Sequence, residues 1–419
     1  MTIEEIELHE IQPSLQSFNR DALKLQQGDS YDTRTIIILR SDSGQEGIGE
    51  TLGAPDTGLR EELDPLRGTN PARWLAHHSL RIGIATAIYD LVAKNLEVPV
   101  SALFGPKLRS WVPVGYWTVS QSPEKMAGEV EHAVQLGYTW LKYHTDQFHN
   151  IIDQTRAMQE VAPPGFKVHY DLNFDGTVEH VAGLANRLSE YPVAGLIEDP
   201  LHPHDLTGYR LLRSKSQLPI VFHHLPLGGR EAVMDLADGY MLGHAPVGQV
   251  IARAGLFEAM NTPFMIQNVG GAITRAMVAH MAAAFEMATM HHVTDTFAWK
   301  EDVTVPDWKV CAGTIQVPDT PGLGVSVDYS ALDKLKSSAP SPMPQALVRV
   351  QAEGIPRAYA RPPRARRDAL GLDPRGVPGI GDGYDNRVDM DYWYDDGSRE
   401  FSELWTRTGV APVICGSGV

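Results

Sequence analysis

The sequence predicts an α/β protein built around a TIM-type barrel, and two observations predict it. From residue 111 onward, short apolar runs recur about 25 to 29 residues apart, the length of one strand, one helix and two loops. Each run is followed by a polar stretch of helical length, and up to eight such units fit into the chain, enough to close a barrel. An open doubly wound sheet would show the same alternation, but the Gly-rich phosphate loop typical of that fold does not follow Tyr116. We therefore favour the barrel.

The part of the chain before residue 108 has a different pattern. Strands are expected over residues 3–11, 35–40 and 47–50, where apolar runs are separated by polar or Gly-containing stretches that suit an antiparallel arrangement. A helix is expected near residues 80–95, because apolar side chains recur there close to helical spacing until Pro and Gly end the pattern. These elements set the N-terminal region apart from the barrel that follows.

The predicted barrel strands come next, and their signal weakens toward the end of the series. They are expected over residues 112–116, 139–142, 166–170, 193–197, 218–222, 239–242, 263–266 and 296–299.

The pattern changes again after about residue 330. Residues 360–367 are basic and proline-rich, which is typical of an extended linker. Residues 389–396 are acidic and aromatic, and so many rings are expected to dock on their own domain or on a neighbouring subunit. A free terminus is the alternative interpretation, and it suits the basic stretch better than the aromatic one.

The composition excludes several classes of protein. With 43% hydrophobic and 21% charged residues the chain is typical of a soluble globular protein. The sequence contains no run of about 18 apolar residues, so no membrane-spanning helix is expected. The formal charge of -16 argues against nucleic acid as the main partner, because binding to phosphates needs a basic face. The acidic start lacks the features of a secretion signal, and two cysteines are too few for a disulfide framework. A cytoplasmic protein is expected.

Polar side chains of the ligand and base types stand at the ends of four successive predicted strands. In barrels, catalytic groups come from the C-terminal strand ends, and residues two apart on a strand share a face. The strands end in Lys142 and His144, Asp171 and Asn173, Glu198 and Asp199, and His223 and His224. Taken singly, each has a plain structural interpretation, as a turn former, a solvated charge or a satisfied histidine pair. Four in succession favour a functional site.

This set of side chains suits the removal of a proton next to a carboxylate. Such a proton is too weakly acidic for a protein base at neutral pH unless positive charge stabilises the enediolate that forms. Aspartate and glutamate oxygens suit Mg²⁺, with substrate oxygens completing its coordination. A lysine beside the metal is expected to have a lowered pKa and to serve as the base.

Several segments jointly resemble the mandelate racemase and muconate-lactonizing branch of the enolase superfamily. The likeness runs from the first residues to about residue 335, some four-fifths of the chain. It is specific for fold and branch and poorly specific for substrate. The segments that carry it are residues 85–105, 112–114, 170–173, 196–200 and 317–325.

The resemblance implies a modified (β/α)₇β barrel over residues 109–317, beneath an α+β capping domain. The capping domain would comprise residues 1–108, completed by about 318–335, and residues 336–419 would form a C-terminal extension. Specificity loops of this lid are expected at residues 14–30 and 53–57. The resemblance further implies Mg²⁺, a small carboxylate substrate such as a sugar acid, and a homo-oligomer.

The sequence departs from the pattern of that branch at three places. Where the branch carries a carboxylate or amide ligand after the fifth strand, this chain has His223 and His224, of which we slightly favour His223. An imidazole ligand makes Mn²⁺ or another divalent ion more plausible. His144 replaces the second lysine of a pair that begins with Lys142, and imidazole accepts a proton near neutral pH without a shifted pKa. The usual histidine–aspartate dyad of the seventh and sixth strands is absent, because Gln267 and its neighbour end the seventh.

These comparisons assign a role to each candidate residue. Lys142 and His144 are the candidate catalytic bases. The candidate metal ligands are Asp171, Glu198, His223 and His224, and the candidate substrate-binding residues are Asn173, Gln267 and Asn268.

One base without a partner on the opposite face of the substrate disfavours racemisation. Dehydration of a sugar acid by a metal-dependent lyase, assisted by an acid that the sequence does not identify, fits better. The alternatives are a cycloisomerase or epimerase of a carboxylate substrate, and a catalytically silent barrel with a role in binding or assembly.

Overall fold

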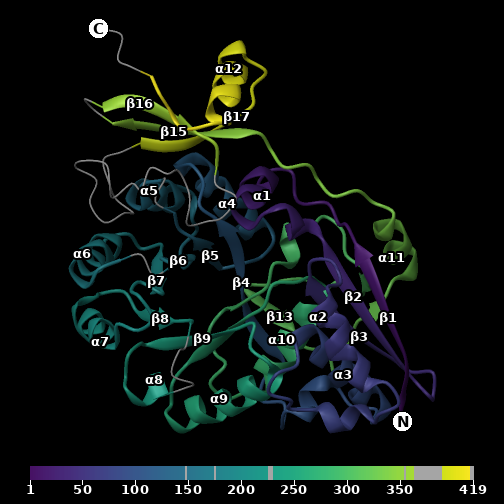
Figure 1. The fold of residues 1–419 in the computed structure, drawn as a ribbon. Coiled ribbons are helices and arrows are strands. Elements are labelled where there is room, and N and C mark those ends of the chain that lie inside the picture. Colours follow the sequence, from purple (N-terminus) through teal and green to yellow (C-terminus); the bar gives the residue numbers. More distant parts are fainter. Residues whose placement is uncertain (147–148, 174–175, 225–229, 353–354, 363–388, 416–419) are drawn as a thin grey trace.

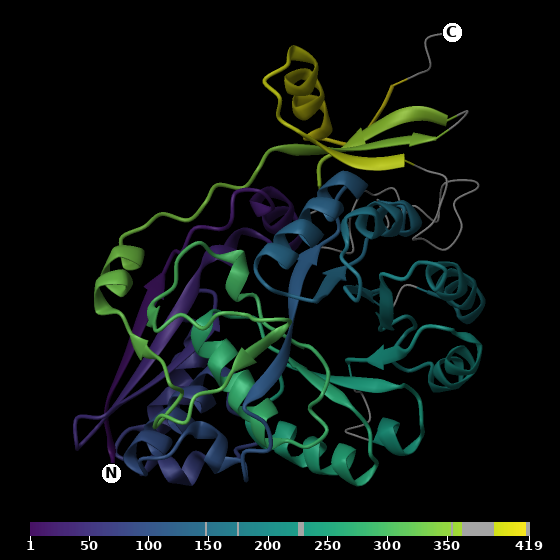
Figure 2. The ribbon, with the colours of Figure 1, turned by 180° about the vertical axis from the view of Figure 1, so that it is seen from behind.

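The computed structural model describes residues 1–146, 149–173, 176–224, 230–352, 355–362 and 389–415. It consists of an N-terminal α+β lobe, a barrel and a small C-terminal sheet capped by a helix (Figure 1). Figure 2 shows from behind that the C-terminal sheet and the N-terminal lobe lie at different sides of the barrel. Within the described ranges, no helix is long and apolar enough to cross a membrane.

The N-terminal lobe is a three-stranded antiparallel sheet in the order β1-β2-β3, with α3 packed against it. The strand β2 is buried along almost its whole length, which explains its unbroken run of isoleucine and leucine. A Cβ placed on Gly49 of β3 would lie 2.0 Å from the carbonyl oxygen of Gly83, so glycine allows α3 to approach the sheet this closely. The elements are β1 (Ile3–Ile11), α1 (Arg20–Gln27), η1 (Asp29–Asp32), β2 (Arg34–Ser41), β3 (Glu46–Leu52), α2 (Thr57–Leu63), η2 (Asp64–Leu66), η3 (Pro71–Trp74), α3 (Ile82–Asn95) and η4 (Val100–Leu103).

Eight parallel strands form a closed barrel, because β11 pairs with both β10 and β4. Seven helices follow the first seven strands, which confirms the predicted (β/α)₇β barrel with an α+β lobe beside it. The strands are β4 (Trp111–Val119), β5 (Trp140–His144), β6 (Lys167–Asp171), β7 (Ala194–Glu198), β8 (Ile220–Phe222), β9 (Gly239–Gly243), β10 (Phe264–Gln267) and β11 (His292–Val293). The helices are α4 (Pro123–Gln135), α5 (Ile151–Val161), α6 (Val178–Leu188), α7 (Leu206–Lys215), α8 (Arg230–Val233), α9 (Val247–Ala259) and α10 (Ala272–Ala284).

The register of the barrel brings the functional strand ends level with one another. His144 pairs with Asp171, and Asp171 pairs with Glu198, in the parallel ladders of β5, β6 and β7. Glu198 is in turn level with Val221 of β8, just before the two histidines. Because these residues are ladder partners and end their strands, the alignment places them side by side at the C-terminal edge of the barrel wall.

The eighth strand was predicted at the wrong place. The barrel is completed by His292–Val293, whereas Thr296–Ala298 form a 3₁₀ turn, η5. The true strand was missed because it is short and begins at His292, the second residue of a buried histidine pair, His291 and His292, that breaks the apolar pattern. The apolar side chains of the 3₁₀ turn imitate a strand because they too are buried.

After the barrel the chain returns to the N-terminal lobe. The strand β13 pairs antiparallel with β4, β12 pairs with β14, and α11 packs on β1. Gly322 exchanges backbone hydrogen bonds with Val98 and Val100, which lie next to α3 and η4. These elements are β12 (Thr304–Val305), β13 (Thr314–Gln316), β14 (Ser326–Val327) and α11 (Tyr329–Lys336).

The C-terminal residues form a four-stranded antiparallel sheet in the order β17-β15-β16-β18. Its own small core includes Leu347, Tyr359 and Phe401, with Trp393 packed against it. The acidic and aromatic stretch predicted to dock is therefore strand β17, whereas most of the basic stretch lies outside the described residues. The elements are β15 (Ala346–Ala352), β16 (Ile355–Ala360), β17 (Asp389–Tyr394), α12 (Arg399–Thr408) and β18 (Val413–Ile414).

Candidate active site

The ammonium group of Lys142 lies at the centre of a buried polar cluster inside the barrel. Its Nζ is 2.7 Å from Oε2 of Glu198 and 3.1 Å from Oδ2 of Asp171. It also donates a hydrogen bond of 2.7 Å to Oε1 of Gln267. Lys142 alternates on β5 with Leu141 and Tyr143, and this period of two aims it into the barrel. Side chains from β6, β7 and the end of β10 thus all contact the same ammonium group, which comes from β5.

Two histidines complete the surroundings of Glu198. The Nε2 atom of His169 lies 2.6 Å from Oε2 of Glu198, and Nδ1 of His223 lies 2.9 Å from Oε1. His169 precedes Asp171 by two residues on β6 and shares its face, a period-two signal that sequence analysis overlooked. The other ring nitrogen of His169 is 3.0 Å from His291, which lies just before β11. Glu198 is therefore enclosed by one ammonium and two imidazoles.

The electrostatics of the cluster keep both carboxylates ionised. Burial opposes the ionisation of Glu198, but Lys142, His169 and His223 hold its pKa well below the ordinary value. Burial and the neighbouring Glu198 oppose the ionisation of Asp171, yet Lys142 and His144 lower its pKa as well. Two carboxylates share one permanently charged ammonium in this buried place, an arrangement that attracts a further cation.

The pKa of Lys142 differs from the lowered value expected of a lysine beside a metal. Burial disfavours its charged form, but the carboxylates of Glu198 and Asp171 outweigh burial and raise its pKa above the ordinary value. An ammonium has three hydrogens, and the contacts with Glu198, Asp171 and Gln267 use all three as hydrogen-bond donors. In this structure Lys142 is a fixed positive charge.

His144 occupies the more accessible position at the same strand end. Its Nε2 lies 3.2 Å from Oδ2 of Asp171, and its side chain is 15% exposed whereas that of Lys142 is fully buried. Its ring meets the edge of Trp117 at 5.1 Å between centroids. The indole and Asp171 together fix the orientation of an imidazole that still reaches the surface of the site.

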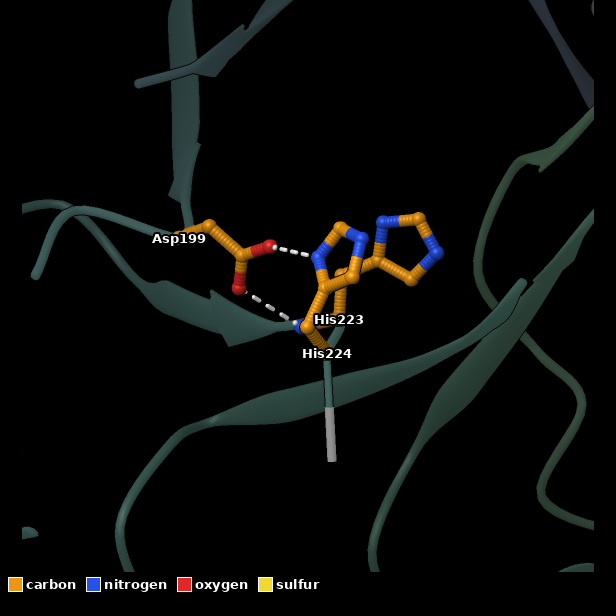
Figure 3. Close-up of side chains that lie close together, drawn as sticks. All are labelled: Asp199, His223 and His224. Atoms are coloured by element: carbon orange, nitrogen blue, oxygen red, sulfur yellow. Dashed lines mark hydrogen bonds and ion pairs between the residues drawn. The ribbon is translucent and has the colours of Figure 1, made fainter. Parts of the chain in front are cut away.

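The two adjacent histidines after β8 have different environments (Figure 3). Oδ1 of Asp199 accepts a 2.9 Å hydrogen bond from the backbone N–H of His223, while its Oδ2 lies 2.7 Å from Nδ1 of His224. The side chain of His224 is 58% exposed and that of His223 only 9%. The structure thus brings His223 to Glu198 and turns His224 toward Asp199. Ligand atoms of Asp199, His223 and His224 all lie within 4.8 Å of one another, a second arrangement with metal-binding character.

The ring of His223 has room only because β9 ends in glycine. A Cβ placed on Gly243 would lie 1.8 Å from Nε2 of His223. The adjoining cavity has a volume of about 530 Å³ and is lined by His223, His224, His244 and Arg253 among others. This cavity opens beside the buried cluster.

The three candidate substrate-binding residues hold other parts of the protein. Asn173 donates from its amide to the backbone oxygens of Thr145 and Asp171, at 3.2 and 3.0 Å. Gln267 accepts from Lys142, as described above, and Asn268 accepts a 3.1 Å hydrogen bond from the backbone N–H of His244. Their side chains therefore bind the strand ends. The side chain of Gln267 contacts the central cluster, and Asn173 reaches it through its backbone N–H, 3.1 Å from Oδ1 of Asp171.

An acidic residue that the sequence did not reveal lies at the end of the eighth strand. Asp295 is 1% exposed and its Oδ2 accepts a 2.6 Å hydrogen bond from the hydroxyl of Tyr31, which comes from the N-terminal lobe. Burial raises the pKa of Asp295 to about 7, against the opposing effects of Tyr31 and Lys142. Because the eighth strand was predicted over residues 296–299, Asp295 was placed before that strand rather than after it.

The comparison with known families bears on this geometry directly. Residues 125–331 match the family described as enolase C-terminal domain-like. The chain belongs to the enolase superfamily. This enolase-superfamily chain is 26% identical over 285 residues to the D-gluconate dehydratase of Thermoproteus tenax, a match that covers 62% of this chain and 56% of that protein. It is 24% identical over 347 residues to muconate cycloisomerase 1-2 of Acinetobacter lwoffii, covering 73% and 88% of the two chains.

The solved structures agree with the fold. The 3,6-anhydro-D-galactonate cycloisomerase of Zobellia galactanivorans superposes with a TM-score of 0.65 at 20% identity, over 80% of this chain and 99% of that one. The fifth of this chain left uncovered is comparable in size to the C-terminal extension.

Members of this superfamily use a divalent metal ion, and the residues of this chain fit one. Asp171 and Glu198 supply hard oxygen donors from adjacent strands, and both already contact the same cationic nitrogen. His223 adds an imidazole next to Glu198. The two buried carboxylates and the oxygen-rich donor set both suit a divalent cation.

Proposed function

We propose that this protein is a metal-dependent lyase that removes the proton next to a carboxylate, and that its substrate is a sugar acid that it dehydrates. The observation that carries the proposal is the convergence of Lys142, Asp171 and Glu198 from three successive barrel strands on one buried point. The similarity to a gluconate dehydratase supports the reaction class. The similarity to a muconate cycloisomerase supports the second candidate, cycloisomerisation or epimerisation of a carboxylate.

The proposed metal ligands are Asp171, Glu198 and His223, with Mg²⁺ as the first choice and Mn²⁺ as the alternative that an imidazole favours. The bound ion would supply the positive charge that stabilises an enediolate. Lys142 contributes a second fixed charge at the same place, because its ammonium is held by both carboxylates. In this proposal His224, exposed and paired with Asp199, does not bind the ion.

His144 is the proposed general base. The Lys142 ammonium is unsuited to this role, because it is fully buried, positively charged and bonded to three groups. The imidazole of His144 reaches the surface of the site, and Asp171 at 3.2 Å stabilises the protonated form that follows proton removal.

Asp295 is the proposed acid that assists departure of the hydroxyl group. It stands at the end of a barrel strand, and a carboxyl whose pKa is about 7 is protonated in about half of the molecules at neutral pH. Lys142 opposes the rise in the pKa of Asp295. The proton taken up by His144 and the one released by Asp295 balance the loss of one water from the substrate.

The test is a screen of metal-depleted full-length protein against a panel of sugar acids, with Mg²⁺ and Mn²⁺ added separately. Dehydration yields a 2-keto acid that reacts with semicarbazide, whereas isomerisation in deuterated water leaves the mass unchanged apart from exchanged deuterium. His144→Gln is expected to lower kcat by about 10²–10⁴-fold. A protein that neither binds a divalent ion nor turns over any acid would support the silent barrel instead.

The expectations of a homo-oligomer and of a cytoplasmic location belong to the same proposal. They are supported by the resemblance to the superfamily and by the low number of cysteines, two in 419 residues. Light scattering of the purified protein gives the oligomeric state directly.

A further inference from the structure

The segment η1 (Asp29–Asp32) of the N-terminal lobe reaches into the active site through Tyr31. This side chain is 2% exposed and its hydroxyl donates to Asp295, the proposed acid, at 2.6 Å. Its ring stacks on Trp299 at 5.6 Å between centroids and lies 6.2 Å from Trp117. Tyr31 thus covers the end of the eighth barrel strand and fixes the carboxyl group of Asp295.

The next residue, Asp32, connects the same segment to a different part of the chain. Its Oδ1 accepts from Nζ of Lys24 at 3.1 Å, and both side chains are only 1% exposed. Its Oδ2 accepts a 2.8 Å hydrogen bond from the backbone N–H of Ser341. Ser341 lies in the connection between α11 and β15, where the chain leaves the N-terminal lobe for the C-terminal sheet.

The C-terminal sheet also contacts the barrel, and its Tyr394 is within electrostatic reach of the N-terminal lobe. The ammonium of Lys125, on barrel helix α4, lies 5.1 Å from the ring centroid of Tyr394 in β17. Burial and the carboxylate of Asp21, on α1 of the N-terminal lobe, raise the pKa of Tyr394. Both views show the sheet above α4 and α1, with the connecting chain running past α1 (Figures 1 and 2).

We propose that the C-terminal extension holds the N-terminal lobe in place over the active site. Asp32 is the positioning residue: it binds the extension at Ser341 and thereby fixes the position of the adjacent Tyr31. Two adjacent residues of one short turn bind the extension and the proposed acid, so a shift at Ser341 moves Tyr31 relative to Asp295. The backbone hydrogen bonds of the turn, from Tyr31 to Gly28 and from Thr33 to Ser30, keep the two contacts rigidly related. The catalytic consequence rests on the proposed function, whereas the mechanical link does not.

Hydrogen–deuterium exchange of the full-length protein tests the link without any substrate. Ser341→Pro removes the backbone N–H that donates a hydrogen bond to Asp32. Ser341→Ala is its matched control because it keeps that N–H. Asp32→Asn is a second variant, which keeps the shape of the side chain but offers one oxygen acceptor instead of two. We expect the amides of residues 29–33 to exchange about tenfold faster in both test variants and at the parental rate in Ser341→Ala.

The amide exchange rates of β15 and β3 serve as an internal reference. Unchanged rates there show that the C-terminal sheet and the N-terminal lobe remain folded in the variants. Rates for residues 29–33 that agree within about twofold between Ser341→Pro and Ser341→Ala would overturn the proposal. If the sugar-acid screen finds a substrate, Ser341→Pro should lower kcat while leaving the affinity for the divalent ion unchanged, and a loss of metal affinity would contradict a positioning role. If the screen finds none, the proposed function fails and the exchange rates still decide the mechanical link.

Discussion

Oε2 of Glu198 lies 2.7 Å from the ammonium nitrogen of Lys142, and Asp171 of the neighbouring strand reaches the same nitrogen at 3.1 Å. Among the described contacts of the cluster, this lysine is the only side chain with a permanent positive charge. The two carboxylates would otherwise face each other unscreened in a buried place. Lys142 therefore stabilises the pair of buried carboxylates as well as the proposed reaction.

Lys142→Met should destabilise the metal-free protein by about 3–5 kcal/mol, the usual cost of removing one partner from a buried ion pair. Added Mg²⁺ or Mn²⁺ should recover more stability in the variant than in the parent, because the ion replaces the missing positive charge. Differential scanning calorimetry with and without each ion measures both effects.

A matched control exists away from the site. Lys94 is 2.7 Å from the buried carboxylate of Asp90 on α3, and Lys94→Met removes a similar ion pair. Its melting temperature should also fall, but divalent ions should not restore it. Equal rescue of both variants would mean that the ions act on the protein nonspecifically.

Replacing the two histidines after β8 separates the possible metal positions. His223→Ala should weaken divalent-ion binding at least tenfold, because His223 contacts Glu198, whereas His224→Ala should change it little. Isothermal titration with Mg²⁺ and Mn²⁺ provides the affinities. If His224→Ala and Asp199→Asn weaken binding as much as His223→Ala does, the ion belongs instead to the group of Asp199, His223 and His224.

A methyl group at Gly243 should disturb the same ligand from behind. The added Cβ would overlap Nε2 of His223, whose ring is held by Glu198 and cannot simply swing away. Gly243→Ala is therefore expected to weaken metal binding to about the level of His223→Ala, with the fold preserved by circular dichroism. Gly255→Ala on α9 is the control, since its Cβ meets nothing within 4 Å and alanine should stabilise the helix by roughly 0.5–1 kcal/mol.

The barrel and most of its strand ends could be predicted because burial there follows the simple rule that apolar runs form the wall. Asp171 and Glu198 each follow such a run directly, so their positions at the strand ends were readable. The eighth strand could not be found in this way, because the buried pair His291 and His292 is satisfied by tertiary contacts that no local pattern records. That error also concealed Asp295.

The state of Lys142 and the division between His223 and His224 depend on distances between strands. The expectation of a lowered lysine pKa considered a metal beside it, whereas the two carboxylates at 2.7 and 3.1 Å raise the pKa of Lys142 in this structure. Likewise, successive side chains of a strand point to opposite sides, so a shift of one residue along β8 would exchange the histidine that faces Glu198. Asp199 fixes this alignment through the backbone N–H of His223.

The titration of Asp295 should appear in both stability and activity. Its pKa in the folded protein, about 7, exceeds that of an exposed aspartate, about 3.9, so the folded state retains a proton that the unfolded chain has released. The contribution of this group to stability is complete below about pH 4 and is lost as the pH rises to 7, a change on the order of 4 kcal/mol. Other groups titrate in the same range, so the informative quantity is the difference from Asp295→Asn, which keeps an acceptor for Tyr31.

Chemical denaturation of both proteins between pH 4 and 8 should therefore give curves that converge as the pH falls and the parent's carboxyl group becomes neutral. With an active sugar acid, kcat/KM of the parent should fall as the pH rises through about 7, because the acid form is then lost. Asp295→Asn should be slow throughout and lack that limb. Parallel stability curves would show that Asp295 is ionised in the fold, and it could then not be the acid that releases the hydroxyl group.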